Sequence, residues 1–195
     1  IKGEDIILTS NDTPADEFQK AIDLGAVINL DDITHIEYLE KNVRLPEFIS
    51  FRYNPGPLLE SSNTIIGKPE EAKYGLTREQ LFEAYKIVKE KGVKRFGLHT
   101  MVISNELNAD CFIATAQMMF ELAVELKQQL DIDLEFVNLG GGVGIPYTPE
   151  QEEVDLEYVG AGIQKVYQNT IEKNNLKPLK IAMELGRSIT GPYGY

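Results

Sequence analysis

The sequence predicts an α/β fold in which parallel strands alternate with helices. Six times along the 195 residues, an apolar strand-like run is followed by a segment that can cross over, usually one with a helical pattern. Alternation of this kind implies parallel strands joined by right-handed crossovers. Two architectures satisfy the pattern, an open doubly wound sheet and a (β/α) barrel, and both stay open at this point.

The expected strands are short apolar runs that end at polar residues or glycines. They cover residues 6–8, 26–30, 48–53, 93–100, 134–139 and 179–183. Such runs are typical of strands buried in a parallel sheet.

Helices are expected between the strands from capping signals and helical spacing. Thr13 and Pro14 have the form of an N-cap and a first helical residue, and Gly25 is expected to end that helix. Thr77 and Gln80 have the spacing of a capping box. The other helices are marked by apolar residues at helical spacing: Ile33, Ile36 and Leu39; Phe112, Ala116, Met119 and Leu126; Leu156, Val159, Ile163 and Val166. Residues 56–76 lack such spacing, and we expect an excursion near a functional face there.

Composition argues against several classes of function. The net charge of −12, without clustered Lys and Arg, argues against nucleic-acid binding. No apolar run approaches the roughly 20 residues that span a bilayer. The single Cys111 excludes an intramolecular disulfide and favours a reducing compartment, so we expect a cytoplasmic protein. No metal site is predicted.

Polar side chains gather at the carboxyl ends of the expected strands, among them Arg52, His99 and Glu184. Because side chains alternate along a strand, Phe96 and Leu98 share one face, which suits the helix layer, and His99 takes the other. Active sites lie at this rim in barrels and at the corresponding crevice in open sheets. The competing interpretation is that Arg52 and Glu184 simply pair with each other.

A glycine-rich loop follows the strand at 134–139. Gly140, Gly141 and Gly142 let the backbone turn tightly and bring its N–H groups against a ligand, and such a loop suits a phosphate. The alternative is a flexible turn.

Taken in order, three motifs resemble a known family: His99, Gly140-Gly-Gly-Val-Gly-Ile-Pro-Tyr147 and Glu184-Leu-Gly-Arg187. They resemble the pyridoxal-phosphate-dependent decarboxylases with an alanine-racemase-like barrel, and the diaminopimelate decarboxylases most of all. Further matches, such as Arg52-Tyr-Asn-Pro-Gly56, extend the resemblance over essentially the whole chain. It implies a (β/α) TIM-type barrel, pyridoxal 5′-phosphate as cofactor, an amino-acid substrate and a homodimer.

The resemblance also implies roles for particular residues. Gly140, Gly141, Gly142 and Ser104 match the residues that bind the cofactor phosphate. Glu184 matches the Glu that pairs with the pyridine nitrogen, and its charge strengthens the ring as an electron sink. Gly186 and Arg187 match residues beside the phosphate or the substrate. We therefore expect Glu184, His99 and Arg52 to be catalytic and Arg187 to bind substrate. The implied reaction converts meso-diaminopimelate to L-lysine and CO2.

Some positions depart from the family pattern. Met101 stands where a second His usually stacks on the ring, Ile103 replaces a Gly, and Leu185 replaces a Pro. These changes suggest a divergent branch with another substrate, such as ornithine, arginine, lysine or carboxynorspermidine. A non-catalytic pyridoxal-phosphate-binding barrel is a further alternative, because Lys73-Tyr-Gly-Leu76 occurs in such proteins as well.

Two parts of the family's enzymes are not matched in the chain. The lysine that holds the cofactor is expected before Ile1, and the C-terminal β-domain is expected after residue 195. Residues 1–195 then form the central and C-terminal part of a barrel domain, incomplete with about six β/α units. Such a fragment is expected to be inactive by itself and to expose sheet edges.

Overall fold

The computed structural model describes residues 3–56 and 74–193, which form one parallel sheet with its strands in sequential order, β1-β2-β3-β4-β5-β6. The strands are β1 (Ile7–Ser10), β2 (Val27–Leu30), β3 (Phe48–Tyr53), β4 (Arg95–Thr100), β5 (Leu134–Gly141) and β6 (Lys180–Glu184). All six predicted strands are therefore present, with ends that differ by at most two residues. Residues 57–73, which hold most of the expected excursion and Lys73, lie outside the described residues.

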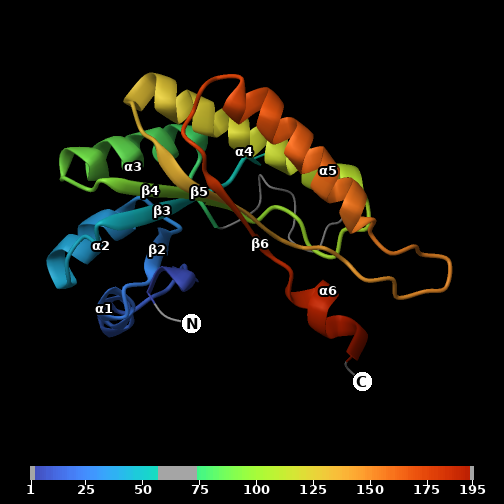
Figure 1. The fold of residues 1–195 in the computed structure, drawn as a ribbon. Helices are drawn as coiled ribbons and strands as arrows, with labels where there is room; N and C mark the ends of the chain where they lie inside the picture. The colour runs from blue at the N-terminus through green and yellow to red at the C-terminus, as the bar shows by residue number, and fades with distance from the viewer. Residues whose placement is uncertain (1–2, 57–73, 194–195) are drawn as a thin grey trace.

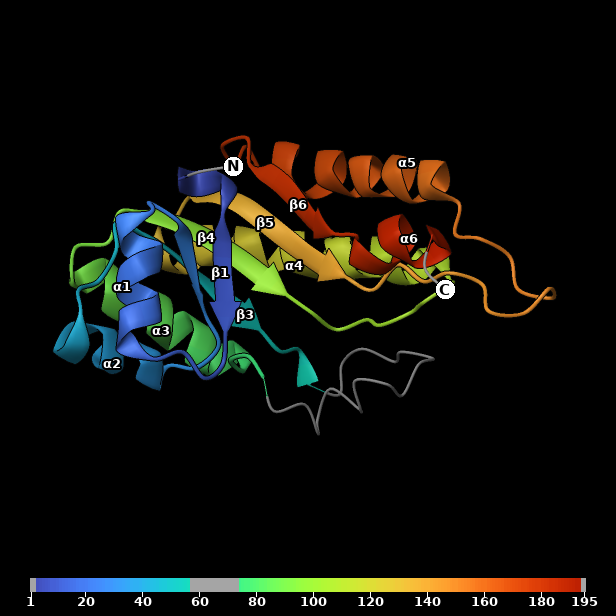
Figure 2. The same cartoon turned by 90° about the horizontal axis from the view of Figure 1, so that it is seen from below.

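Helices cover the outer side of a curled sheet (Figure 1). They are α1 (Ala15–Asp23), α2 (Thr34–Asn42), α3 (Arg78–Glu90), α4 (Ala109–Leu130) and α5 (Leu156–Tyr167), with the short α6 (Gly186–Thr190) after β6. Short turns of other helix types lie at Gly3–Asp5, Gln168–Glu172 and Gly191–Tyr193. A doubly wound sheet would reverse its strand order and carry helices on both faces. The described residues instead form a half-barrel, whose strands all point the same way (Figure 2). None of their helices is long and apolar enough to cross a membrane.

The outer face of the sheet is the apolar core. Phe51, Leu98 and Val137 stand side by side on β3, β4 and β5 and are fully buried. The ring of Tyr85 from α3 meets Phe51 edge-on at 5.0 Å and Phe96 at 6.0 Å between ring centroids. The predicted parity of β4 is confirmed, since Phe96 and Leu98 pack under the helices while His99 takes the inner face.

Most predicted helix ends are confirmed. Gln80 N donates to Thr77 Oγ1 and Thr77 N donates to Gln80 Oε1, so the capping box is complete. Gly25 follows α1 with a φ of +72°, as expected of a residue that ends a helix. The start of α1 was wrong by one residue: Pro14 is the N-cap, and no side chain caps the helix.

One predicted core residue lies at the surface. Leu156 is the first residue of α5 and is 52% exposed, whereas Val159 and Ile163 are buried. A residue in the first turn projects beyond the body of the helix, so helical spacing alone does not bury it.

Candidate active site

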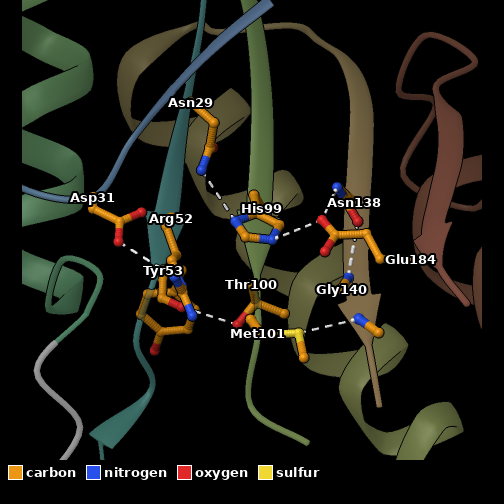
Figure 3. A network of polar contacts seen from close by, with 11 residues as sticks. Asn29, Asp31, Arg52, Tyr53, His99, Thr100, Met101, Asn138, Gly140 and Glu184 are labelled. Carbon is orange, nitrogen blue, oxygen red and sulfur yellow. Dashed lines mark hydrogen bonds and ion pairs between the residues drawn. The ribbon is translucent and has the colours of Figure 1, made fainter. Parts of the chain in front are cut away.

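Polar side chains from neighbouring strands converge at the carboxyl end of the half-barrel (Figure 3). Arg52 on β3 pairs in register with His99 on β4, which pairs with Asn138 on β5. Glu184 is the last residue of β6, and Asp31 directly follows β2. The predicted gathering of polar side chains at this rim is therefore confirmed, since residues from five adjacent strands meet there.

His99 lies at the centre of this rim and is only 2% exposed. Its Nδ1 is 3.1 Å from Nδ2 of Asn29, and its Nε2 is 3.3 Å from Oε1 of Glu184. The imidazole thus joins β2 to β6 across the inner face.

Glu184 is held as a carboxylate. Its pKa lies below the ordinary value chiefly because of the contact with His99, and the Asn138 amide and the charge of Arg52 act in the same direction against burial. Asn138 Nδ2 donates to Glu184 Oε1 at 2.9 Å. The Glu184 side chain remains 50% exposed, so its charge is available to a partner at the rim.

Arg52 does not pair with Glu184, so the competing interpretation of the sequence was wrong. Arg52 Nη1 lies 3.2 Å from Asp31 Oδ2, and its guanidinium lies 5.3 Å from the centre of the Tyr74 ring. The other oxygen of Asp31, Oδ1, is buried and has no hydrogen-bond partner within residues 3–56 and 74–193. A buried carboxylate oxygen without a donor is costly and is characteristic of functional sites.

The glycine loop is a packed junction rather than a loose turn. A Cβ placed on Gly140, Gly141 or Gly142 would lie 2.3 Å from a backbone oxygen, that of Thr100, Glu184 and Ile103 respectively. Gly140 and Gly142 also have positive φ angles, +73° and +93°. Only glycine lets the end of β5 fit between the segments that follow β4 and β6.

Two N–H groups of this loop already have acceptors. Gly140 N donates to Asn138 Oδ1 at 2.9 Å, and Gly141 N lies 3.2 Å from the sulfur of Met101. Asn138 therefore ties the loop to Glu184, and Met101, which departs from the family pattern, holds the loop from the other side. An anion bound at Gly140 or Gly141 would compete with these acceptors.

The other predicted binding residues are Ser104, Gly186 and Arg187. The backbone N of Ser104 lies 3.1 Å from the place where a Cβ of Gly142 would be. Gly186 begins α6, and no atom of the described residues lies within 4 Å of its Cβ position, which leaves space beside it within this part of the chain. Arg187 is exposed and donates from Nη1 to the Tyr147 hydroxyl at 3.2 Å. The structure thus places Ser104 at the loop and Arg187 beside Tyr147.

Sequence reasoning missed three members of this site. Asn29, Asp31 and Asn138 lie in or directly after the expected strands, but none of them is predicted as a site residue from the sequence. The available signal was their parity, because Asn29 and Asp31 alternate with apolar Ile28 and Leu30 along β2.

Comparisons with known proteins agree with this geometry. The family described as "Pyridoxal-dependent decarboxylase, pyridoxal binding domain" matches residues 1–191. "Protein TabA" of Pseudomonas amygdali pv. tabaci is 32% identical over 99% of this chain and 44% of its own length. A diaminopimelate decarboxylase of Methanothermobacter thermautotrophicus is 28% identical over 97% of this chain and 44% of its own length.

Among solved structures, the diaminopimelate decarboxylase of Helicobacter pylori complexed with L-lysine superposes with a TM-score of 0.81 at 25% identity. That match covers 97% of this chain and 47% of the other. The chain spans somewhat less than half the length of the relatives that it matches. Its six strands and their helices match part of the alanine-racemase-like (β/α) barrel, and the chain belongs to the pyridoxal-binding domain family of the pyridoxal-dependent decarboxylases.

Proposed function

We propose that the protein containing this chain is a pyridoxal-phosphate-dependent decarboxylase that converts meso-diaminopimelate to L-lysine and CO2. One observation carries the proposal: a charged, half-exposed Glu184 stands beside the glycine loop, fixed by His99 and Asn138. Membership of the family and the diaminopimelate decarboxylases among its relatives support it.

The residues present fit the cofactor. An anionic phosphate suits the space at Gly186, which follows Glu184 by two residues, because Gly141 of the glycine loop packs against the Glu184 backbone. Glu184 suits a ring nitrogen that must keep its proton, because the lowered pKa of the Glu184 carboxyl keeps this side chain negatively charged. Among the described residues Asp31 Oδ1 has no hydrogen-bond partner, so the inner face can make a further polar contact with a bound group.

Bound pyridoxal phosphate would supply an electron-withdrawing ring that accepts the electron pair left when CO2 departs. Glu184 would hold a proton at the ring nitrogen, and His99 and Asn138 would keep the carboxylate charged and oriented. Arg52, fixed by Asp31, would place a positive charge on the same inner face. Gly140, Gly141, Gly142, Gly186 and Ser104 would bind the phosphate, and Arg187 would bind a substrate carboxylate.

Further parts of the enzyme complete this proposal. The lysine that holds the cofactor covalently and a C-terminal β-domain would lie outside residues 1–195, and the enzyme would act as a cytoplasmic homodimer. The single Cys111 has a pKa raised by burial, which fits a structural residue in a reducing compartment.

Release of CO2 from meso-diaminopimelate by the full-length protein with added pyridoxal phosphate tests the proposal. We expect Glu184→Gln to lower kcat by about 100-fold, because a charge that acts on the reacting system is removed while the shape is kept. Glu90→Gln makes the same chemical change on the exposed side of α3 and should leave kcat unchanged. A wild-type protein that releases no CO2, or a Glu184→Gln enzyme as fast as wild type, would contradict the proposal.

A second candidate is a related decarboxylase with another substrate, favoured by Met101 at the loop, where the family usually has His. Turnover of ornithine, arginine, lysine and carboxynorspermidine by the same preparation separates the two. Cofactor binding without CO2 release from any of these substrates would instead favour a non-catalytic barrel.

A further inference from the structure

The two ring nitrogens of His99 face groups of different kinds. Nδ1 faces the side-chain amide of Asn29, which comes from the middle of β2 and is 1% exposed. Nε2 lies 3.3 Å from Oε1 of the Glu184 carboxylate and has no hydrogen bond of good geometry among the described residues. Figure 3 shows the imidazole between these two neighbours.

Both contacts favour the same tautomer. A carboxylate can only accept hydrogen bonds, so a proton on Nε2 is favoured where that nitrogen meets Glu184. In the neutral ring Nδ1 then carries a lone pair, which accepts from the Asn29 Nδ2 group at 3.1 Å. The opposite tautomer would set a lone pair of Nε2 against the negative charge of Glu184 at 3.3 Å.

We propose that Asn29 is a positioning residue that fixes His99 with its proton on Nε2, the nitrogen that lies beside Glu184. Asn29 acts through His99, which keeps Glu184 charged and restricts its orientation. The consequence for catalysis rests on the proposed function, whereas the tautomer is a property of the protein without cofactor.

Nitrogen-15 NMR of the cofactor-free full-length protein tests the tautomer directly, because protonated and unprotonated ring nitrogens resonate far apart. The His99 signals are assigned by their loss in His99→Gln, and His35 serves as an internal reference. We expect a protonated Nε2 and an unprotonated Nδ1 in the wild type near neutral pH.

Two variants and a control establish the cause. Asn29→Leu removes the amide at similar size and leaves only the Glu184 contact, so we expect the preference for a proton on Nε2 to weaken. Asn29→Asp turns the donor into an acceptor, so we expect a proton on Nδ1. Ser50→Ala changes the buried residue in register with Asn29 on β3 and should leave the ring as in the wild type. An Nδ1 proton in the wild type, or identical spectra for wild type and both Asn29 variants, would overturn the assignment.

In the holoenzyme we expect Asn29→Leu to lower kcat by about tenfold, the loss of roughly one hydrogen bond, with the KM for the amino acid unchanged. Ser50→Ala should match the wild type. A normal kcat in Asn29→Leu would refute the positioning role even if the preference for the Nε2 proton weakens. The NMR result can agree with the proposal while neither the wild type nor any variant decarboxylates a substrate. In that case the proposed function fails and the tautomer assignment stands.

Discussion

Two arginines on the inner face of the half-barrel have contrasting surroundings. Arg95, at the amino end of β4, contacts the carboxylates of both Glu4 and Glu135 and stacks over the Phe48 ring. Arg52, near the carboxyl end of β3, has a single ion pair, with Asp31, among the described residues. The pKa of Arg95 is raised mainly by hydrogen bonds to Glu135 and Glu4.

The contrast indicates that the two ends of the barrel have different roles. At the amino end, Arg95 has its carboxylate partners, and Phe136 packs so closely over Gly97 that a Cβ there would lie 2.1 Å from its ring. Towards the carboxyl end, Asp31 Oδ1 and His99 Nε2 are buried without a hydrogen-bond partner within the described part of the chain. Saturated contacts serve stability, whereas unsatisfied buried polar atoms indicate a site that takes a ligand.

The largest expected effect comes from breaking the pair at the carboxyl end. Arg52→Met leaves the Asp31 side chain, 3% exposed, as an unpaired buried charge, and should lower the free energy of unfolding by about 3–4 kcal/mol. Arg95→Met is the control. The carboxylates that pair with Arg95 are more than a third exposed, so the loss of these ion pairs should lower the free energy of unfolding by less, about 1 kcal/mol. Urea unfolding measures both.

The double variant Asp31→Leu, Arg52→Met sharpens this result. Removing both charges should recover most of the lost stability without restoring decarboxylation, if the pair is functional. A double variant with wild-type turnover would assign the pair to stability alone.

A smaller effect is expected from the glycine loop. Gly142 and Gly92 have the same φ of +93°, but only Gly142 has an atom close to its Cβ position. Both alanine variants carry the strain of the left-handed region, and Gly142→Ala should cost about 1–2 kcal/mol more because backbone must move. Equal thermal and urea stability of the two variants would contradict the packing described for the loop.

The smallest effect is the pH dependence of Glu184. Its folded pKa is below the ordinary value of 4.5, so its stabilising contribution is present above that value and is lost as the pH falls through the folded pKa. The stability difference between wild type and Glu184→Gln should therefore shrink on acidification below the ordinary value. Glu90→Gln should show no comparable trend, and urea unfolding at several pH values checks both.

Local patterns in the sequence predicted the alternating strands and helices and the place of the polar rim, whereas the choice of a barrel over an open sheet came from the family resemblance. Apolar runs gave the six strands, and the alternation of Phe96, Leu98 and His99 gave the face on which His99 lies. The pairing partners could not be predicted in this way. Asn29 and His99 are 70 residues apart, and Arg52 and Asp31 are 21 apart, so their contacts depend on the register and curvature of the sheet.

Other misses have local causes. Thr13 resembled a helix cap, but Pro14 has an extended ψ of 160° and is itself the N-cap, so Thr13 lies one residue too early to cap α1. The contact between Met101 and Gly141 had no sequence signal, because it depends on how closely two strand ends approach.

The central claim is that the carboxyl-end rim binds pyridoxal phosphate, and a titration of the cofactor into the full-length protein tests it most directly. Fluorescence or calorimetry would compare the wild type with Gly142→Ala and Gly92→Ala. We predict that Gly142→Ala weakens binding at least about tenfold, or ~1.4 kcal/mol, while Gly92→Ala binds as the wild type does. Equal affinity of all three proteins, or no binding by the wild type, would contradict the account.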